Sequence, residues 1–161
     1  MKGEPLPQER EVRIDLPVKA FIPVGWVGQE ALRLELYRRI ATAGDHERLE
    51  EIRVEATDRF GRLPPEVETL FAVASLRITC LRLGVEAITI YRDHVRAKPV
   101  ALSDAQALGL ADRVAEGRYH VTTSTLNLSP GRVGLVELPG WVERALLAAT
   151  GSELPSVSIA G

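Results

Sequence analysis

Residues 45–66 have the sequence DHERLEEIRVEATDRFGRLPPE, and this stretch predicts two consecutive helices. Asp45 is a favourable N-cap, because its carboxylate can accept a hydrogen bond from a backbone N–H that the first helical turn leaves unpaired. Gly61 suits the residue that ends a helix, since glycine tolerates a positive φ. Prolines 64–65 then favour the first turn of the next helix. We therefore expect a helix over 46–60 and a second one that starts at the prolines.

The helix predicted over 46–60 has an apolar side and an acidic side. At 100° per residue, a band about 80° wide holds four carboxylates, which we call the acidic stripe: Glu47, Glu51, Glu55 and Asp58. The opposite side is apolar and is expected to face the core: Leu49, Ile52, Ala56 and Phe60. Residues 45–60 carry six acidic side chains and three arginines, which gives a local charge of −3.

The acidic stripe works against the helix that carries it. Like charges four residues apart cost about 0.2–0.5 kcal/mol per pair, and Asp58 lies near the helix C-terminus, where the macrodipole disfavours a negative charge. One interpretation is a solvated face on which Arg48 and Arg59 offset part of the repulsion. The other is a docking surface for a basic partner, centred on Glu55, Asp58 and Arg59, because paired carboxylates can receive arginines in bidentate geometry.

The rest of the chain predicts further helices and a small sheet. Val12, Ile14 and Leu16 alternate with polar residues, which is typical of a strand. Other strands are predicted over 85–92, 94–100, 118–123 and 132–138. Other helices are predicted from Gln29 to near Gly44, over 104–115 with a weak point at Gly109, and over 140–150 after Pro139. The expected fold class is α+β, with amphipathic helices in the first half, a small mixed or antiparallel sheet, and further helices after it.

Length and composition limit the possible protein classes. The 161 residues fit one domain over 11–150, with a flexible leader at 1–10 and a flexible tail at 151–161. A content of 45% hydrophobic and 26% charged residues excludes wholesale disorder. No apolar run reaches the length of a membrane span, and the single cysteine fits a reducing, cytoplasmic compartment. The net charge of −2 argues against a dedicated nucleic-acid-binding domain.

Few residues suggest catalysis or cofactor binding. The chain has no GxxxxGK[ST] motif for nucleotide phosphates, and no cofactor is predicted. The histidines at 46, 94 and 120 have no partners at metal-ligand spacing, so no metal site is predicted. The alternative of an enzyme would use Asp93 with His94, near His120, and Ser124 as nucleophile, whereas a solvated turn explains the same residues. Cys80 is expected to be a buried, inert thiol.

Two further groups of residues could contact a partner. The first is the arginine-rich helix near 29–44, whose candidates for nucleic-acid contact are Arg33, Arg38 and Arg39, with Tyr37 nearby. A solvated helix face explains them equally well, and neighbouring acidic stretches would repel phosphate. The second group is Trp26 and Trp141, each beside a glycine, which suit either core packing or a partner-binding anchor.

The first half of the chain also resembles a known family. The segments RIDLPVKAFIP, RLELYRRIA, LEEIRVEATDRFGRLPPEVETLFAVASLRI and LGVEAI are similar, in order and spacing, to the C-terminal domain of bacterial transcription-repair coupling factors. The similarity covers about residues 12–91, and the block from Asp58 to Glu66 is its most specific part. Beyond Tyr91 the similarity is slight.

This resemblance implies a regulatory domain and no reaction. Proteins of this family are large ATP-driven DNA translocases that remove stalled RNA polymerase and recruit UvrA through a UvrB-like N-terminal module. The C-terminal domain is implied to pack on that module in cis and to hide its UvrA-binding surface. The implied contact residues match Glu55, Asp58 and Arg59, opposite arginines of the module. The motor lies outside these 161 residues, so ATPase activity, direct DNA binding and membrane association are not expected of them.

Overall fold

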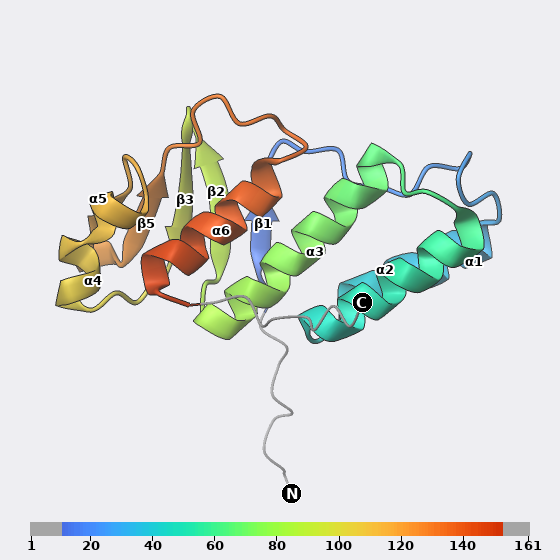
Figure 1. Ribbon diagram of the computed structural model, residues 1–161, viewed down its shortest axis with the longest axis horizontal. Coiled ribbons are helices and arrows are strands. Elements are labelled where there is room, and N and C mark those ends of the chain that lie inside the picture. Colours follow the sequence, from blue (N-terminus) through green and yellow to red (C-terminus); the bar gives the residue numbers. More distant parts are fainter. Residues whose placement is uncertain (1–10, 153–161) are drawn as a thin grey trace, which may run out of the picture.

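The computed structural model describes residues 11–152, and in it α-helices and strands combine into an α+β fold (Figure 1). The predicted leader and all but two residues of the predicted tail lie outside this range. The elements in order are β1 (Arg13–Asp15), α1 (Glu30–Thr42), α2 (His46–Phe60), α3 (Pro65–Leu83), β2 (Ala87–Tyr91), β3 (His94–Lys98), α4 (Asp104–Leu108), α5 (Leu110–Arg113), β4 (Arg118–His120), a 3₁₀ turn η1 (Val121–Thr123), β5 (Thr125–Leu128) and α6 (Leu138–Thr150). None of the described helices is long and apolar enough to cross a membrane.

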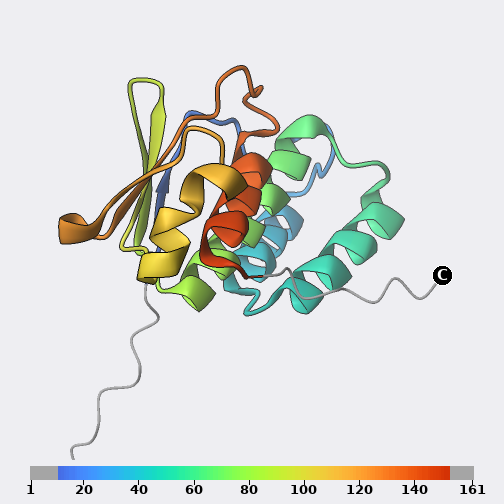
Figure 2. The same ribbon diagram turned by 60° about the vertical axis from the view of Figure 1, so that its left-hand side comes forward.

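The elements form three layers. Figure 2 shows the sheet on one side, α3 and α6 in the middle, and α1 and α2 on the far side. One hydrophobic core lies between the sheet and the middle helices, and a second lies between α3 and the α1–α2 pair. Helix α3 contributes to both cores, with Leu76 and Cys80 in the first and Phe71 and Ile78 in the second. Burial on both sides explains why this helix is apolar around most of its circumference.

The sheet has five strands in the order β1-β2-β3-β5-β4. Strand β1 runs parallel to β2, and the other neighbours are antiparallel. Side chains alternate between the core and solvent, as in β3, where Val95 and Ala97 are fully buried. Within residues 11–152 the helices cover only one face of the sheet, so these residues leave the other face open (Figure 2).

The two helices predicted from residues 45–66 are confirmed. Asp45 caps α2, since its Oδ1 accepts a hydrogen bond from the backbone N–H of Arg48 at 2.7 Å. Gly61 ends α2 with a φ of 92°, and α3 begins at Pro65. This turn sets the direction of α2 relative to α3, and therefore the direction in which the acidic stripe points.

The predictions after residue 100 are partly wrong. The segment predicted as a strand over 132–138 forms turns up to Glu137, and Leu138 begins α6, because Pro130 and Gly134 close turns through their carbonyls and the segment has no neighbouring strand. The missed strand is β5, in which Leu126 and Leu128 are buried and alternate with polar residues. The strand predicted over 118–123 stops at His120 and continues as η1. The helix predicted over 104–115 breaks at Gly109 into the short helices α4 and α5.

Candidate docking surface on helix α2

The acidic stripe lies on the solvent side of α2. Glu47, Glu51, Glu55 and Asp58 are all exposed, and the opposite side of the helix is buried at Leu49, Ile52 and Ala56. Phe60 is only partly buried, which corrects the expectation that it faces the core fully. A shallow hollow runs along the stripe and is lined by Glu47, Glu50, Glu51, Val54, Glu55, Asp58 and Arg59. The helical projection therefore selected side chains that share one surface.

Glu55 is held by an arginine of the neighbouring helix. Its carboxylate forms an ion pair with the guanidinium of Arg39 on α1, at 2.5 Å. The hydrogen bond from Arg39 lowers the pKa of Glu55 below its ordinary value, and the charges of Arg39, Arg59 and Arg48 act in the same direction. The same hydrogen bond raises the pKa of Arg39. Glu55 stays exposed, so the ion pair leaves part of the carboxylate open to a partner.

Asp58 and Arg59 sit at the C-terminal end of the stripe. Asp58 is exposed and has no ion-pair partner within residues 11–152. The guanidinium of Arg59 lies 5.0 Å from the ring centroid of Phe60, and Trp26 meets the same ring edge-on at 5.4 Å. The contact with Trp26 holds the Phe60 ring, and the guanidinium of Arg59 packs against that ring. Trp26 therefore has a packing role, while Trp141 packs against the core beside the sheet.

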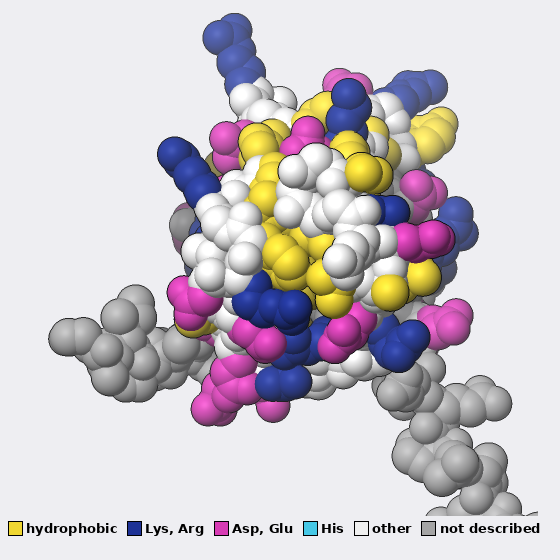
Figure 3. All heavy atoms as spheres, turned by 90° about the vertical axis from the view of Figure 1, so that its right-hand side faces the viewer, with side chains coloured by type: hydrophobic (Ala, Val, Ile, Leu, Met, Phe, Trp, Pro, Cys, Tyr) yellow, Lys and Arg dark blue, Asp and Glu magenta, His cyan; other side chains and the backbone are white. Residues whose placement is uncertain are grey.

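Apolar side chains lie close to the charged ones on this side of the molecule. Figure 3, which faces the α1–α2 side, shows an apolar area in the centre with basic and acidic side chains around and below it. Val54 is 52% exposed within the stripe itself, and Phe21 and Val24 are exposed in the loop before α1. A polar rim around exposed apolar side chains is the usual composition of a protein-binding surface.

The arginines of α1 mostly serve the fold. Arg33 donates to the carbonyls of Val27 and Gly28, both at 2.9 Å, and so closes the loop before the helix. Arg39 is used by Glu55, and the hydroxyl of Tyr37 accepts a hydrogen bond from the backbone N–H of Ile22. Of the three arginines, Arg38 is exposed and has no side-chain hydrogen bond or ion pair within residues 11–152. These contacts explain Arg33 and Arg39 without a nucleic acid.

The residues of the predicted enzyme alternative do not come together. Nδ1 of His94 lies 3.1 Å from the hydroxyl of Ser129, whereas His120 lines a different hollow of the sheet. Asp93 lies at the exposed tip of the β2–β3 hairpin, and Ser124 follows η1. No arrangement of nucleophile, base and orienting acid is formed by these four residues.

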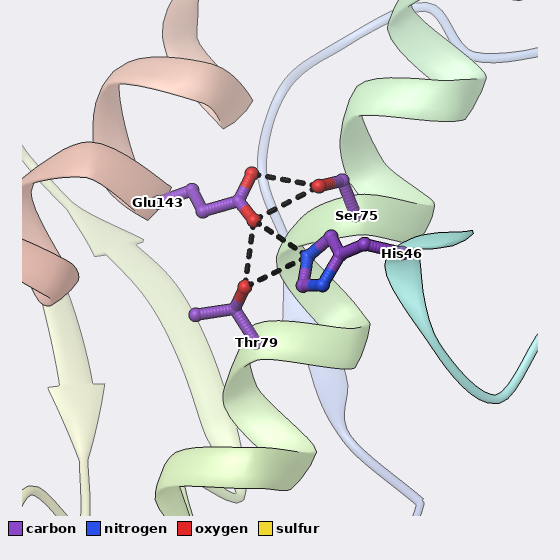
Figure 4. A network of polar contacts seen from close by, with 4 residues as sticks. All are labelled: His46, Ser75, Thr79 and Glu143. Atoms are coloured by element: carbon purple, nitrogen blue, oxygen red, sulfur yellow. Dashed lines mark hydrogen bonds and ion pairs between the residues drawn. The ribbon is translucent and has the colours of Figure 1, made fainter. Parts of the chain in front are cut away.

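Sequence reasoning missed a buried polar cluster between the middle layer and α2. Glu143 of α6 accepts hydrogen bonds from the hydroxyls of Ser75 and Thr79 on α3, at 2.9 and 2.6 Å. Nε2 of His46, the first residue of α2, lies 3.1 Å from both Glu143 and Thr79 (Figure 4). The Thr79 hydroxyl proton is used by Glu143, so Nε2 must carry a proton to complete the cluster. The spacing of these residues, 97 positions apart at the extremes, gives no signal in the sequence.

This cluster resembles a catalytic triad only in its residue types. In a triad the histidine contacts the serine through one nitrogen and the acid through the other, but here Ser75 and His46 both contact the same carboxylate. The cluster therefore joins α2, α3 and α6. Nearby Cys80 is fully buried, as expected, and burial raises the pKa of its thiol to about 12. Within residues 11–152 no group of three His, Cys, Asp or Glu side chains is placed to hold a metal ion.

Comparisons with known proteins agree with this structure. The sequence model of the family described as "TRCF domain" matches residues 16–107. Curated relatives include transcription-repair-coupling factors from Mycobacterium bovis, 35% identical over 133 residues and 82% of this chain, and from Staphylococcus haemolyticus, 30% identical over 72% of this chain. The relative from Escherichia coli is 38% identical over 50% of this chain. The chain spans only 11% of the length of the first of these relatives.

A solved structure has the same fold. The crystal structure of the C-terminal domain of a transcription-repair coupling factor superposes with a TM-score of 0.73, covering 88% of this chain and 90% of that one, at 13% sequence identity. At this identity the match establishes the fold alone, and the family assignment comes from the sequence comparisons. This chain therefore belongs to the TRCF domain family of the bacterial transcription-repair coupling factors.

Proposed function

We propose that this domain is a non-catalytic regulatory part of a bacterial, cytoplasmic transcription-repair coupling translocase. In this proposal the acidic stripe docks on the UvrB-like N-terminal module of the same polypeptide and masks the module's UvrA-binding surface. The motor that moves on DNA lies elsewhere in the full-length protein, and RNA polymerase and UvrA are partners of that protein as a whole. The observation that carries the proposal is the exposure of four carboxylates on one side of α2, of which Asp58 at the helix C-terminus has no ion-pair partner within residues 11–152.

The pairing of the carboxylates supports docking over a merely solvated face. Among the four, Glu51 pairs with Arg48 and Glu55 pairs with Arg39. Asp58 has no such partner in the described part of the chain, although it lies where the helix macrodipole disfavours it. An arginine from another surface would compensate for both the repulsion along the stripe and the unfavourable position of Asp58.

The surface also defines the chemistry of its partner. Glu55 and Asp58 lie three residues apart on α2 and can receive two arginines, or one arginine in a bidentate contact. Val54 lines the same hollow and offers an apolar contact beside them, so the partner should present an aliphatic side chain beside its arginines. Arg59 is held against Phe60 and can pair with an acidic group at the edge of the contact.

The proposal is tested by reversing the charge at the centre of the stripe. In the full-length protein, the double variant Glu55→Lys with Asp58→Lys should free the N-terminal module and raise UvrA binding in a pull-down. A matched control, Glu86→Lys with Asp112→Lys, makes the same charge change at exposed residues away from the stripe. The control should leave UvrA binding at the wild-type level. Circular dichroism of the isolated domain should show both double variants folded.

A binding assay with separate parts gives the second measurement. The isolated domain should bind the isolated UvrB-like module, and the double variant should bind at least about tenfold more weakly, because attraction is replaced by repulsion. Added salt should weaken the wild-type contact, since exposed charges are screened within about 10 Å at 0.1 M. Equal UvrA binding by wild type and by the stripe variant would contradict the proposal.

A further inference from the structure

The open face of the sheet carries an unexplained group of basic and polar side chains. The register places Thr89, Arg96, Asn127 and Arg118 in one row across β2, β3, β5 and β4. Lys98 lies two residues from Arg96 on the same face of β3, and both are exposed. We call the face that these five residues define the basic sheet face. The helices pack on the other side of the sheet, so nothing in residues 11–152 covers it (Figure 2).

Two hollows lie side by side on the basic sheet face and share Arg96 and Asn127 in their linings. The linings together contain three permanent cations, Arg96, Lys98 and Arg118, and a single carboxylate, that of Glu116, for a formal charge of +2. The register places the amide of Asn127 between Arg96 and Arg118, and the hydroxyls of Thr89 and Thr125 line the same hollow as Arg96 and Lys98. The Oδ1 atom of Asn127 is buried and has no hydrogen-bond partner in the described chain.

We propose that the basic sheet face binds the phosphate backbone of a single-stranded nucleic acid. The three cations supply the attraction to phosphate, and the neutral donors beside them are groups that proteins use for contacts to phosphate and sugar. Neighbouring strands lie about 4.8 Å apart and alternate residues of a strand about 6.7 Å apart, so the cations are spread over a distance that successive phosphates of an extended strand can follow.

The composition of the face favours nucleic acid over an acidic protein segment. A protein interface has an apolar centre, but the only apolar side chain in the two linings is Ala87. Tyr91, 52% exposed, stands at the end of β2, and the guanidinium of Arg96 lies 4.7 Å from its ring centroid. An exposed ring beside a cation suits stacking of a base whose phosphate the cation holds. A flat sheet face can contact a single strand along its length, but it cannot enter the groove of a duplex.

The proposal predicts a measurable, salt-dependent affinity. Fluorescence anisotropy with a labelled single-stranded DNA of mixed sequence, titrated with the 161-residue protein, should saturate at low salt. Three phosphate contacts predict a slope of log K against log salt of about −2, from a slope of about −0.7 per contact for single strands. The same sequence as a duplex should bind more weakly, and a single-stranded RNA should bind similarly to the DNA.

Charge-reversal variants locate the binding to this face. Arg96→Glu with Arg118→Glu should weaken binding at least tenfold, because two cations in the row become repulsive. The matched control is Arg38→Glu with Arg62→Glu, two exposed arginines on α1 and in the loop after α2, which changes the net charge equally. The control should bind within about twofold of wild type. Circular dichroism and the urea midpoint should show that both variants keep the fold.

Three outcomes would overturn the proposal. One is an equal loss in the two double variants, which would indicate only a response to net charge. Another is an absence of saturation up to about 1 mM protein, weaker than ordinary non-specific binding of nucleic acid. The third is displacement of the oligonucleotide by a poly-glutamate peptide at equal charge concentration, which would assign the face to acidic protein segments. None of these outcomes involves the acidic stripe, so docking through α2 stands or falls separately.

Discussion

The acidic stripe on α2 and the basic sheet face lie on opposite sides of α3 and α6, and they carry opposite charge (Figure 2). The stripe comes from one continuous helix, has an exposed valine at its side and pairs with an arginine of the preceding helix. The sheet face comes from four separate strands, and Ala87 is the one apolar side chain that lines its two hollows. The net charge of −2 is therefore the sum of two separated surfaces of opposite charge and the rest of the chain. Net charge is a poor guide to partners when the fold sorts the charges by face.

The connection between these two regions is the place where a substitution should have the largest effect. Glu143→Ala removes the carboxylate that accepts from Ser75 and Thr79 and contacts His46, so these three partly or fully buried groups lose their shared acceptor and only the contact between Thr79 and His46 remains. We expect a loss of about 3 kcal/mol in the free energy of unfolding. Urea denaturation measures it, with the exposed neighbour Arg144→Ala as control. If Glu143→Ala and Arg144→Ala lower the free energy of unfolding equally, the cluster does not stabilise the packing of α2 against α3 and α6.

The turn that directs the acidic stripe should be the next most sensitive position. Gly61 has a φ of 92°, so Gly61→Val forces a branched residue into a region that L-residues avoid, at a cost of about 1–3 kcal/mol. Gly44 is the matched control, because a Cβ would meet open space at both positions and only Gly61 has a positive φ. Gly44→Val should stay within about 0.5 kcal/mol of wild type by thermal or urea unfolding. An equal loss of stability in Gly61→Val and Gly44→Val would mean that the positive φ of Gly61 is not the cause.

The two regions also show how far sequence reasoning reaches. The stripe was predictable because helical period, N-cap and terminating glycine all lie within residues 45–61, and local rules fix their geometry. The partner of Glu55 was not predictable, since Arg39 is 16 residues away and meets it only after α1 and α2 pack. The one available signal was the presence of two arginines, Arg38 and Arg39, on the helix next to an acidic one.

The basic sheet face and the buried polar cluster could not be predicted because they depend on which elements pack together. The row from Thr89 to Arg118 depends on strand order and register, and β5, which supplies Asn127, was not predicted. The segment 132–138 showed strand-like alternation but had no neighbour to pair with, so turns prevailed. Patterns of period 2 indicate a strand only where another strand is present to accept its hydrogen bonds.

A substitution of Arg39 should change binding at the acidic stripe and leave binding at the basic sheet face unchanged. In Arg39→Gln the carboxylate of Glu55 loses its internal cation and becomes fully available to a basic partner. Because a partner arginine no longer competes with Arg39 for this carboxylate, affinity for the UvrB-like module should rise, by up to about fivefold. Calorimetric titration of the isolated domain with the module measures this. Binding of single-stranded DNA to the basic sheet face serves as the internal control and should not change.

The smallest expected effect is in the titration of Glu55 itself. Its pKa is lower in the folded protein than the ordinary value of 4.5, chiefly through the hydrogen bond from Arg39. A group whose pKa is lowered by folding stabilises the fold above its unfolded pKa, and this contribution is lost as the pH falls through the folded pKa. The wild-type protein should therefore lose stability below pH 4.5 more steeply than Arg39→Gln, in which the pKa of Glu55 returns towards its ordinary range. Carbon-detected NMR of the Glu55 carboxyl measures its pKa in the wild-type protein and in Arg39→Gln. Identical titration of Glu55 in the two proteins would mean that the ion pair between α1 and α2 is not maintained in solution, and the acidic stripe would then present all four carboxylates without an internal partner from α1.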